Sequence, residues 1–295
     1  MAYSKQNFQD GQILSAANLE KMENGIIAAQ NPRNLLDNSD FSNPVNQRGG
    51  TSYSGSGYSI DRWYGNGSNQ IVQVFDSCVK VSATGTSYCG LRQKVLRMAS
   101  LAGKTITFAA KVYSNVVPSI RFINANASTL AYKDGTNGTT TTIVLTYTVP
   151  SGATLDTVIP IIIAKTTAAD DYINIYWAAI YEGSYTADTL PEYVPKGYAM
   201  EFAECNRCYK ILNIYIPPWL IEGTNIRRYG ISYRPMRIPP TADVSGLKEY
   251  ATWTDLGSTI NPYNSASDRL LMSATTETSS TRVYLAGTLK LSAEP

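Results

Sequence analysis

The sequence predicts a mainly β protein built as a β-sandwich, and three observations lead to this prediction. Runs of β-branched and aromatic residues recur along the chain, as in 105–113, 158–163 and 172–181. Turn signals such as Asn137-Gly138 separate these runs. No helical pattern lies between them, and strands at this spacing without intervening helices are typical of sandwiches.

The chain begins with a short predicted helix over 16–29, with Ser15 as its N-cap. Its apolar residues follow the three-four-three spacing of a heptad seam and are Leu19, Met22, Ile26 and Ala29. Two heptads are marginal in isolation. The helix therefore either packs on its own domain or joins a parallel bundle at the axis of a homotrimer, and we favour the homotrimer.

The strands are expected in two groups on either side of a linker. The first group is 71–75, 78–81, 90–96, 105–113, 119–123, 139–149, 158–163 and 172–181. A linker at 191–195 leads into a helix predicted over 196–212, with Phe202, Cys205, Tyr209 and Leu212 on one face. The second group is 229–233, 250–253, 269–274 and 282–291. We therefore divide the chain into segments 1–33, 34–191, 192–212 and 213–295.

Composition limits the classes of function. Charged residues make up only 16% of the 295 residues and the net charge is +2, so the clustered basic face of a nucleic-acid-binding protein is not expected. Tyrosine is abundant, with 21 residues against 6 phenylalanines. Its apolar ring with a polar tip suits strands, subunit interfaces and sugar-binding faces.

Neither a membrane span nor a signal peptide is expected. The longest apolar run, 158–164, has the length of a strand, far short of the ~20 residues of a spanning helix. The first eleven residues are polar and lack the basic-then-apolar order of a signal peptide. We expect synthesis in a cytoplasm followed by assembly into a particle or release on lysis.

Catalytic and metal-binding residues are scarce. The chain has no histidine, which excludes Ser-His-Asp and Cys-His nucleophiles. Cys205 and Cys208 form a CxxC without a second pair, so no zinc site is expected. Cys78 and Cys89 fall on candidate neighbouring strands and either form a disulfide or stay as buried free thiols.

Segment 34–64 carries a resemblance to a known family. It begins Asn-Leu-Leu-Asp-Asn-Ser-Asp-Phe and ends Asp-Arg-Trp-Tyr. This sequence resembles the start of a lectin-like jelly-roll module in tail-fibre and baseplate proteins of phages and prophages of Gram-positive bacteria. The run 173–183 resembles the last strand of carbohydrate-binding jelly rolls, so the likeness covers 34–191. It implies that Trp63 packs into the sandwich while Asp61 and Arg62 make local pairs.

Three further segments resemble phage tail proteins. Segment 8–26 is similar to their N-terminal segment, 204–209 to a motif that joins the jelly roll to a C-terminal β domain, and 234–241 to a strand opening of that domain. The resemblance implies a homotrimeric tail-fibre or receptor-binding protein of the virion. It would join other tail or baseplate proteins through its N-terminus and bind a bacterial surface polysaccharide. The alternative is a structural baseplate or collar component without a receptor site.

Candidate ligand-binding residues cluster in the C-terminal domain, which the resemblance places at the receptor-binding tip. They are Trp219, Arg227, Arg228, Tyr229, Tyr233, Trp253 and Tyr263. Several of them are expected on or beside loops, where binding sites usually reside. The two arginines suit an acidic group on the ligand. Trp63 is a further candidate as a sugar platform, although a core position is favoured.

No catalytic residues are assigned. The acidic residues are sparse and form no recognisable pair of the kind that glycoside hydrolysis requires. We therefore expect a binding protein and not an enzyme, with no cofactor. Asp170-Asp171 is a candidate for structural calcium, although a solvated loop is favoured there.

Overall fold

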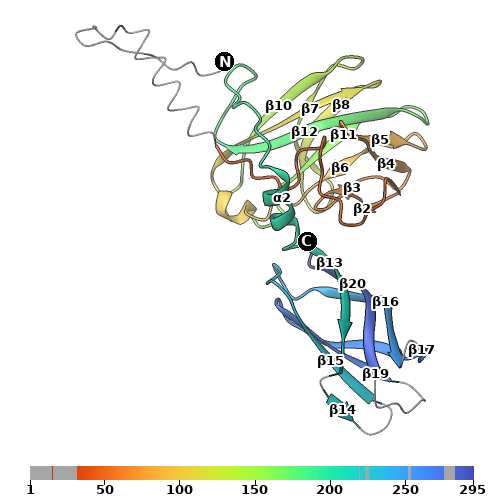
Figure 1. Ribbon diagram of the computed structural model, residues 1–295. Helices are drawn as coiled ribbons and strands as arrows, with labels where there is room; N and C mark the ends of the chain where they lie inside the picture. Colours follow the sequence, from red (N-terminus) through yellow and green to blue (C-terminus); the bar gives the residue numbers. More distant parts are fainter. Residues whose placement is uncertain (1–14, 16–31, 219, 223–225, 252–253, 276–282) are drawn as a thin grey trace.

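Two pairs of antiparallel sheets, joined by one short helix, make up most of the described chain (Figure 1). The computed structural model describes residues 15, 32–218, 220–222, 226–251, 254–275 and 283–295. The predicted helix over 16–29, and with it the predicted trimer axis, lies outside these residues. None of the helices within the described ranges is long and apolar enough to cross a membrane.

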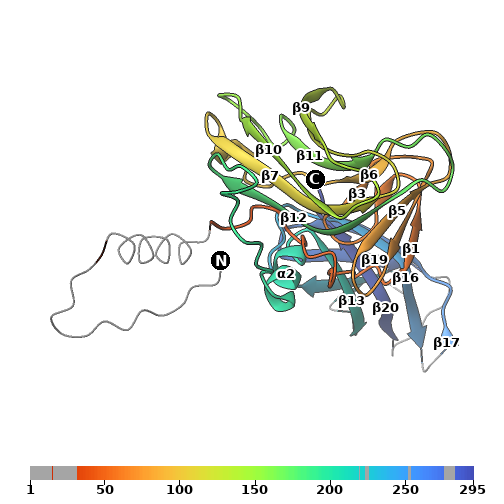
Figure 2. The same ribbon diagram turned by 90° about the horizontal axis from the view of Figure 1, so that it is seen from above.

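The first sandwich consists of two six-stranded sheets. Sheet A has the order β1 (Ser52–Ser54), β4 (Gln70–Val74), β5 (Val79–Ala83), β12 (Tyr172–Glu182), β7 (Thr105–Ser114) and β10 (Thr141–Thr148). Sheet B has the order β2 (Gly57–Tyr58), β3 (Tyr64–Gly65), β6 (Cys89–Arg92), β11 (Ile159–Ala164), β8 (Pro118–Ile123) and β9 (Thr129–Asp134). The edge strands β10 and β9 lie side by side, on the side away from the helix (Figure 2).

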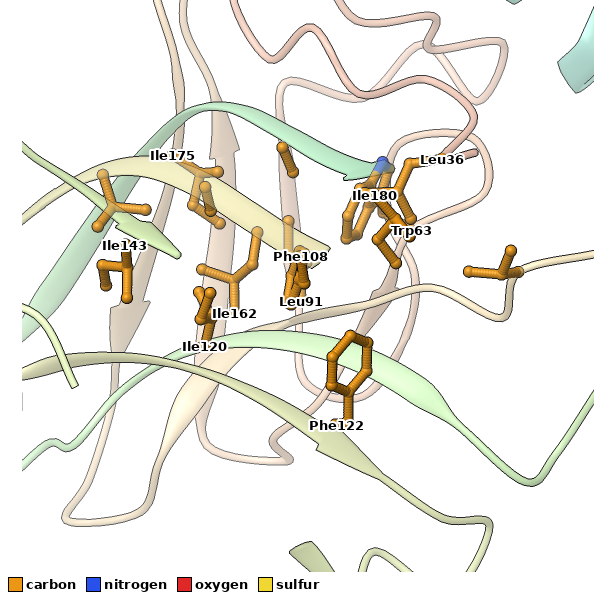
Figure 3. Close-up of a cluster of buried hydrophobic side chains, with 14 of the residues drawn as sticks. Leu36, Trp63, Leu91, Phe108, Ile120, Phe122, Ile143, Ile162, Ile175 and Ile180 are labelled. Carbon is orange, nitrogen blue, oxygen red and sulfur yellow. The ribbon is translucent and has the colours of Figure 1, made fainter. Parts of the chain in front are cut away.

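The core lies between these two sheets (Figure 3). Alternate residues of each strand point inward, as the period of two in the sequence predicts. The rings of Phe108 from sheet A and Phe122 from sheet B meet with centroids 5.6 Å apart. Ile162 and Ile175 are fully buried in the same cluster, and each such side chain stabilises the fold by about 1.5–3 kcal/mol.

Segment 34–41 continues sheet A as an irregular strand along β12. Leu35 N–H donates to the Ile180 carbonyl at 2.9 Å, and Phe41 N–H donates to that of Tyr176 at 3.1 Å. Leu36 and Phe41 have no exposed surface. These two side chains, with the partly buried Leu35 beside them, therefore anchor the opening segment in the core.

The helix predicted over 196–212 is wrong in its second half. Helix α2 spans only Tyr198–Cys205, and the chain then enters β13 (Tyr209–Ile216). Strand β13 pairs with β20 over eight residue pairs. Its sequence, Tyr-Lys-Ile-Leu-Asn-Ile-Tyr-Ile, is rich in β-formers, so pairing with a distant strand overrides the helical spacing.

The second sandwich consists of two four-stranded sheets. Sheet C has the order β13, β20 (Val283–Ser292), β16 (Thr241–Ala251) and β17 (Thr254–Asp255). Sheet D has the order β14 (Leu220–Glu222), β15 (Ile226–Ser232), β19 (Arg269–Thr275) and β18 (Thr259–Ser265). Met272 from sheet D and Leu285 and Leu289 from sheet C share one buried cluster.

All four cysteines are buried free thiols. Cys78 and Cys89 therefore form no disulfide, which decides between the two alternatives for this pair. Burial raises the pKa of the Cys89 thiol to about 12, and burial likewise raises the pKa of Cys205 and of Cys208. These thiols are therefore protonated at neutral pH and behave as small apolar side chains.

Candidate functional site

Trp63 lies in the interior of the first sandwich. It has no exposed surface, and its indole Nε1 donates to the Asn38 carbonyl at 2.7 Å. Beside it, Asp61 accepts a hydrogen bond from Gln47 at 2.7 Å. Arg62 donates to the Asp37 carboxylate at 3.0 Å. This matches the core arrangement that the family resemblance implies, and a ligand on the surface does not reach the Trp63 ring.

Arg227 and Tyr229 also point inward, from the central strand β15. Both are fully buried and both contact the buried carboxylate of Glu249. The Arg227 guanidinium lies 3.0 Å from Glu249 Oε2, and the Tyr229 hydroxyl donates to Oε1. Burial and this carboxylate raise the pKa of Tyr229. The predicted ligand surface therefore does not include these two side chains in this conformation.

Arg228 and Tyr263 are the predicted residues that the structure brings together at the surface. The guanidinium carbon of Arg228 lies 5.0 Å from the centre of the Tyr263 ring, which is 46% exposed. The Tyr233 hydroxyl instead donates to the Ala266 carbonyl at 2.8 Å and fixes a turn. Trp219 and Trp253 lie outside the described residues.

A different surface collects aromatic and basic side chains, on the face of sheet B that points away from the core. Strand register aligns one residue from each of five strands into the tyrosine–arginine row, which consists of Tyr64, Arg92, Ile161, Arg121 and Tyr132. Directly paired residues in antiparallel strands point to the same face. Their chain neighbours Trp63, Leu91, Ile120, Phe122 and Ile162 fill the core on the other face.

Each arginine of this row rests against tyrosine rings. The guanidinium carbon of Arg92 lies 4.8 Å from the centre of the Tyr64 ring. That of Arg121 lies 5.0 Å from the ring of Tyr88 and 5.8 Å from that of Tyr132. Tyr88 is 49% and Tyr132 is 59% exposed. Cation–π contacts therefore hold the rings in place while their other surfaces stay open to solvent.

An apolar floor lies beneath and beside the row. Ile123, Ile159, Ile161 and Ile163 form a buried cluster of their own, separate from the main core. Next to Ile163 in the sheet is Gly90, where a methyl group would overlap the Ile162 carbonyl oxygen and lie 2.8 Å from Ile163 Cγ2. Two strands can approach this closely only with glycine at this position.

A charged pair borders the row. Lys165 Nζ lies 2.5 Å from Asp134 Oδ2 and 5.6 Å from the centre of the Tyr132 ring. Although burial opposes it, hydrogen bonds from Lys165 and Ser119 hold the pKa of Asp134 below its usual value. The carboxylate is thus ionised at neutral pH and supplies a hydrogen-bond acceptor beside the arginine and lysine donors.

Taken together, this face offers exposed rings above a buried isoleucine cluster, with charged donors and acceptors beside them. Aromatic rings stack on the apolar C–H faces of sugars, and guanidinium and carboxylate groups can bond to hydroxyls. The sequence did not reveal this face because its members come from strands whose mutual register is not encoded locally.

A second set of tyrosines lies on sheet C. The centre of the Tyr284 ring is 4.4 Å from that of Tyr215 and 5.6 Å from that of Tyr250. Tyr215 is 63% exposed. These rings form a second aromatic surface, on the second sandwich.

The acidic turn considered for calcium has another role. Asp171 Oδ2 accepts hydrogen bonds from the backbone N–H groups of Thr167 at 2.7 Å and Ala168 at 2.9 Å. These bonds hold the pKa of Asp171 below its usual value. The carboxylate thus closes its own loop, and within the described ranges no three metal-ligating side chains gather.

No family model matches the chain, and no curated protein matches it. Among solved structures, it is similar to a Clostridium thermocellum xylanase 10B fragment with CBM22-1 and GH10 modules (16% identity, 52% of this chain, 29% of that one, TM-score 0.35). It is also similar to the CBM22-2 xylan-binding domain of Paenibacillus barcinonensis Xyn10C (14%, 50% and 99%, TM-score 0.35). A third likeness is to tailspike protein 4 of bacteriophage CBA120 (16%, 51% and 21%, TM-score 0.33). These TM-scores indicate a distant likeness that extends over about half of this chain.

Proposed function

We propose that this protein binds a polysaccharide through the outer face of sheet B. The observation that carries the proposal is the tyrosine–arginine row over its isoleucine floor. Rings that are exposed yet held by arginines form a preorganised platform, so little side-chain entropy is lost when a sugar stacks on them. The face carries three cations, Arg92, Arg121 and Lys165, and one carboxylate, Asp134. This excess of positive charge favours a neutral or mildly acidic glycan.

We further propose that this binding serves adhesion to a bacterial surface in a phage-like particle. The support is the resemblance of segments 8–26 and 34–64 to tail proteins. In this proposal the protein is a homotrimer of the virion, attached through its N-terminus to tail or baseplate partners. Three weak sites on one axis would multiply into useful avidity. No catalysis is part of the proposal.

Tyr132 and Tyr215 provide a matched pair of variants for the test, because both are exposed tyrosines on strands. Labelled protein is titrated onto a panel of intact Gram-positive cells, with extracted cell-wall polysaccharide as competitor. We expect Tyr132→Ala to weaken saturable binding by about tenfold, and Tyr215→Ala to leave it unchanged. Loss with Tyr215→Ala alone would move the site to sheet C.

The alternative is a structural component of the same kind of particle. If no strain binds the folded wild-type protein and no extracted polysaccharide is retained, the adhesion proposal fails and the structural role takes its place. Release of reducing ends from the polysaccharide during the assay would instead indicate a depolymerase.

A further inference from the structure

A cavity of about 290 Å³ lies where the first sandwich, helix α2 and the second sandwich meet. This volume is close to the lower end of the range for small-molecule sites. Five cations line it, namely Arg33, Arg97, Lys196, Arg207 and Arg237, together with the carboxylates of Asp37 and Glu204. The lining therefore carries three positive charges in excess, in a chain whose net charge is only +2.

Two of the five cations are neutralised within the cavity wall. Glu204 lies 2.5 Å from an Arg33 guanidinium nitrogen and 2.7 Å from Lys196 Nζ. Asp37 accepts from Arg62 at 3.0 Å and lies 3.7 Å from Lys196 Nζ. Both carboxylates are thus already compensated.

The remaining three cations have no carboxylate partner in the part of the chain that the structure describes. Arg237 donates through Nε and a terminal nitrogen to the Ala293 carbonyl, at 3.3 and 3.2 Å, which is a neutral acceptor. Arg97 and Arg207 are exposed and make no ion pair there. The Arg237 backbone N–H donates to the Arg207 carbonyl at 2.8 Å, so these two residues lie side by side in the cavity wall.

We propose that this cavity binds a doubly charged oxyanion, either a free phosphate or sulfate ion or the phosphate of a sugar ester. Guanidinium groups present paired N–H donors that match the oxygens of such anions. Arg97 belongs to the first sandwich, Arg207 follows α2, and Arg237 belongs to the second sandwich. An oxyanion bound by all three would tie the two sandwiches together. This site is separate from the sheet B face and does not depend on glycan binding.

The test is calorimetric titration of the full-length chain with sodium phosphate, sodium sulfate and glucose 6-phosphate, at constant ionic strength adjusted with sodium chloride. We expect saturable binding of the dianions that also raises the melting temperature. The double variant Arg97→Gln/Arg207→Gln should bind about tenfold more weakly or worse. The control Arg269→Gln, an exposed arginine outside the cavity, should bind as the wild type does.

Tighter binding of glucose 6-phosphate than of phosphate assigns the cavity to a sugar ester, and equal affinity assigns it to the anion alone. Equal stabilisation by chloride at the same ionic strength, or equal affinity of the double variant and the wild type, overturns the proposal. Cell binding by the double variant should be unchanged, which separates this test from that of the sheet B face.

Discussion

Gly90 shows how one residue sets the approach of two strands at the candidate site. It pairs with Ile163 of β11, and a methyl group in place of its hydrogen would meet backbone atoms that cannot move aside. Strand glycines often mark such a close approach. The close approach of β6 and β11 beside the tyrosine–arginine row depends on this position.

We expect Gly90→Ala to lower the free energy of unfolding by about 1–3 kcal/mol, the usual cost of overpacking. Urea unfolding measures this loss. The control is Gly85→Ala, where a methyl group meets only the Asn69 side chain at 3.5 Å or beyond. A loss of similar size in both variants would contradict the argument.

Glu249 is a second residue whose role depends on burial. It accepts from Arg227, Tyr229 and Ser258, with the Ser258 hydroxyl at 2.5 Å. The sequence suggested a ligand role for Arg227 and Tyr229 because turn signals lie near them. Their partner Glu249 lies 20 or more positions further along the chain, on another sheet. No local sequence pattern therefore predicts this buried cluster.

Removing the charge of Glu249 should be strongly destabilising, because this carboxylate lies 3.0 Å from the buried Arg227 guanidinium. We expect Glu249→Gln to cost about 3–5 kcal/mol, measured by urea unfolding. The control, Asp255→Asn, breaks the exposed pair with Lys248 at 2.7 Å and should leave stability unchanged within error. A loss of unfolding free energy in Glu249→Gln no larger than in the control would show that the Arg227–Glu249 pair contributes little to stability.

At the scale of elements, the sequence predicted most strands that are rich in apolar β-formers and missed strands that are largely polar or exposed. The candidates 105–113 and 269–274 match β7 and β19 to within one residue. Strand β9 was missed because five of its six residues are exposed and no apolar alternation marks it. The tyrosine–arginine row needs the register of β3, β6, β11, β8 and β9 together, which is set by tertiary packing.

Segment 34–41 acts as an element although it is not a regular strand. Because Phe41 is fully buried, we expect Phe41→Ala to cost about 3–5 kcal/mol. Hydrogen exchange should also become faster at the Ala178 amide, which donates to the Ser39 carbonyl at 3.0 Å. Phe75→Ala is the control, since that ring is 47% exposed. Unchanged protection of Ala178 would mean that the segment is held by other contacts.

At the scale of the whole molecule, a buried ionic junction joins the two sandwiches. Arg48 lies 2.9 Å from Asp61 and also pairs with Glu294, which follows β20. Its guanidinium carbon lies 3.9 Å from the centre of the Tyr209 ring at the start of β13. Glu294 also accepts from the Arg62 N–H at 3.1 Å. The Asp-Arg-Trp motif thus fixes the second sandwich to the first, so we expect the two to unfold together.

Stability should therefore rise on mild acidification. Burial raises the pKa of Asp61 from 3.8 to about 6, although hydrogen bonds from Gln47 and Arg48 oppose the shift. Burial also raises the pKa of Glu201 and of Glu294. The folded protein therefore binds protons that the unfolded chain does not, and this stabilisation is complete below about pH 4 and lost as the pH rises through about 6.

The linked free energy for Asp61 is on the order of 3 kcal/mol, so the melting temperature should increase from about pH 7 to pH 4.5. Carboxyls with a lowered pKa, such as Asp171, act in the opposite direction, but only below about pH 4. Asp61→Asn cannot take up the proton and should flatten the profile whatever its absolute stability. A melting temperature that falls steadily from pH 7 to 5, or an equal slope in Asp61→Asn, would show that the junction carboxylates are well solvated and that the two sandwiches move apart in solution.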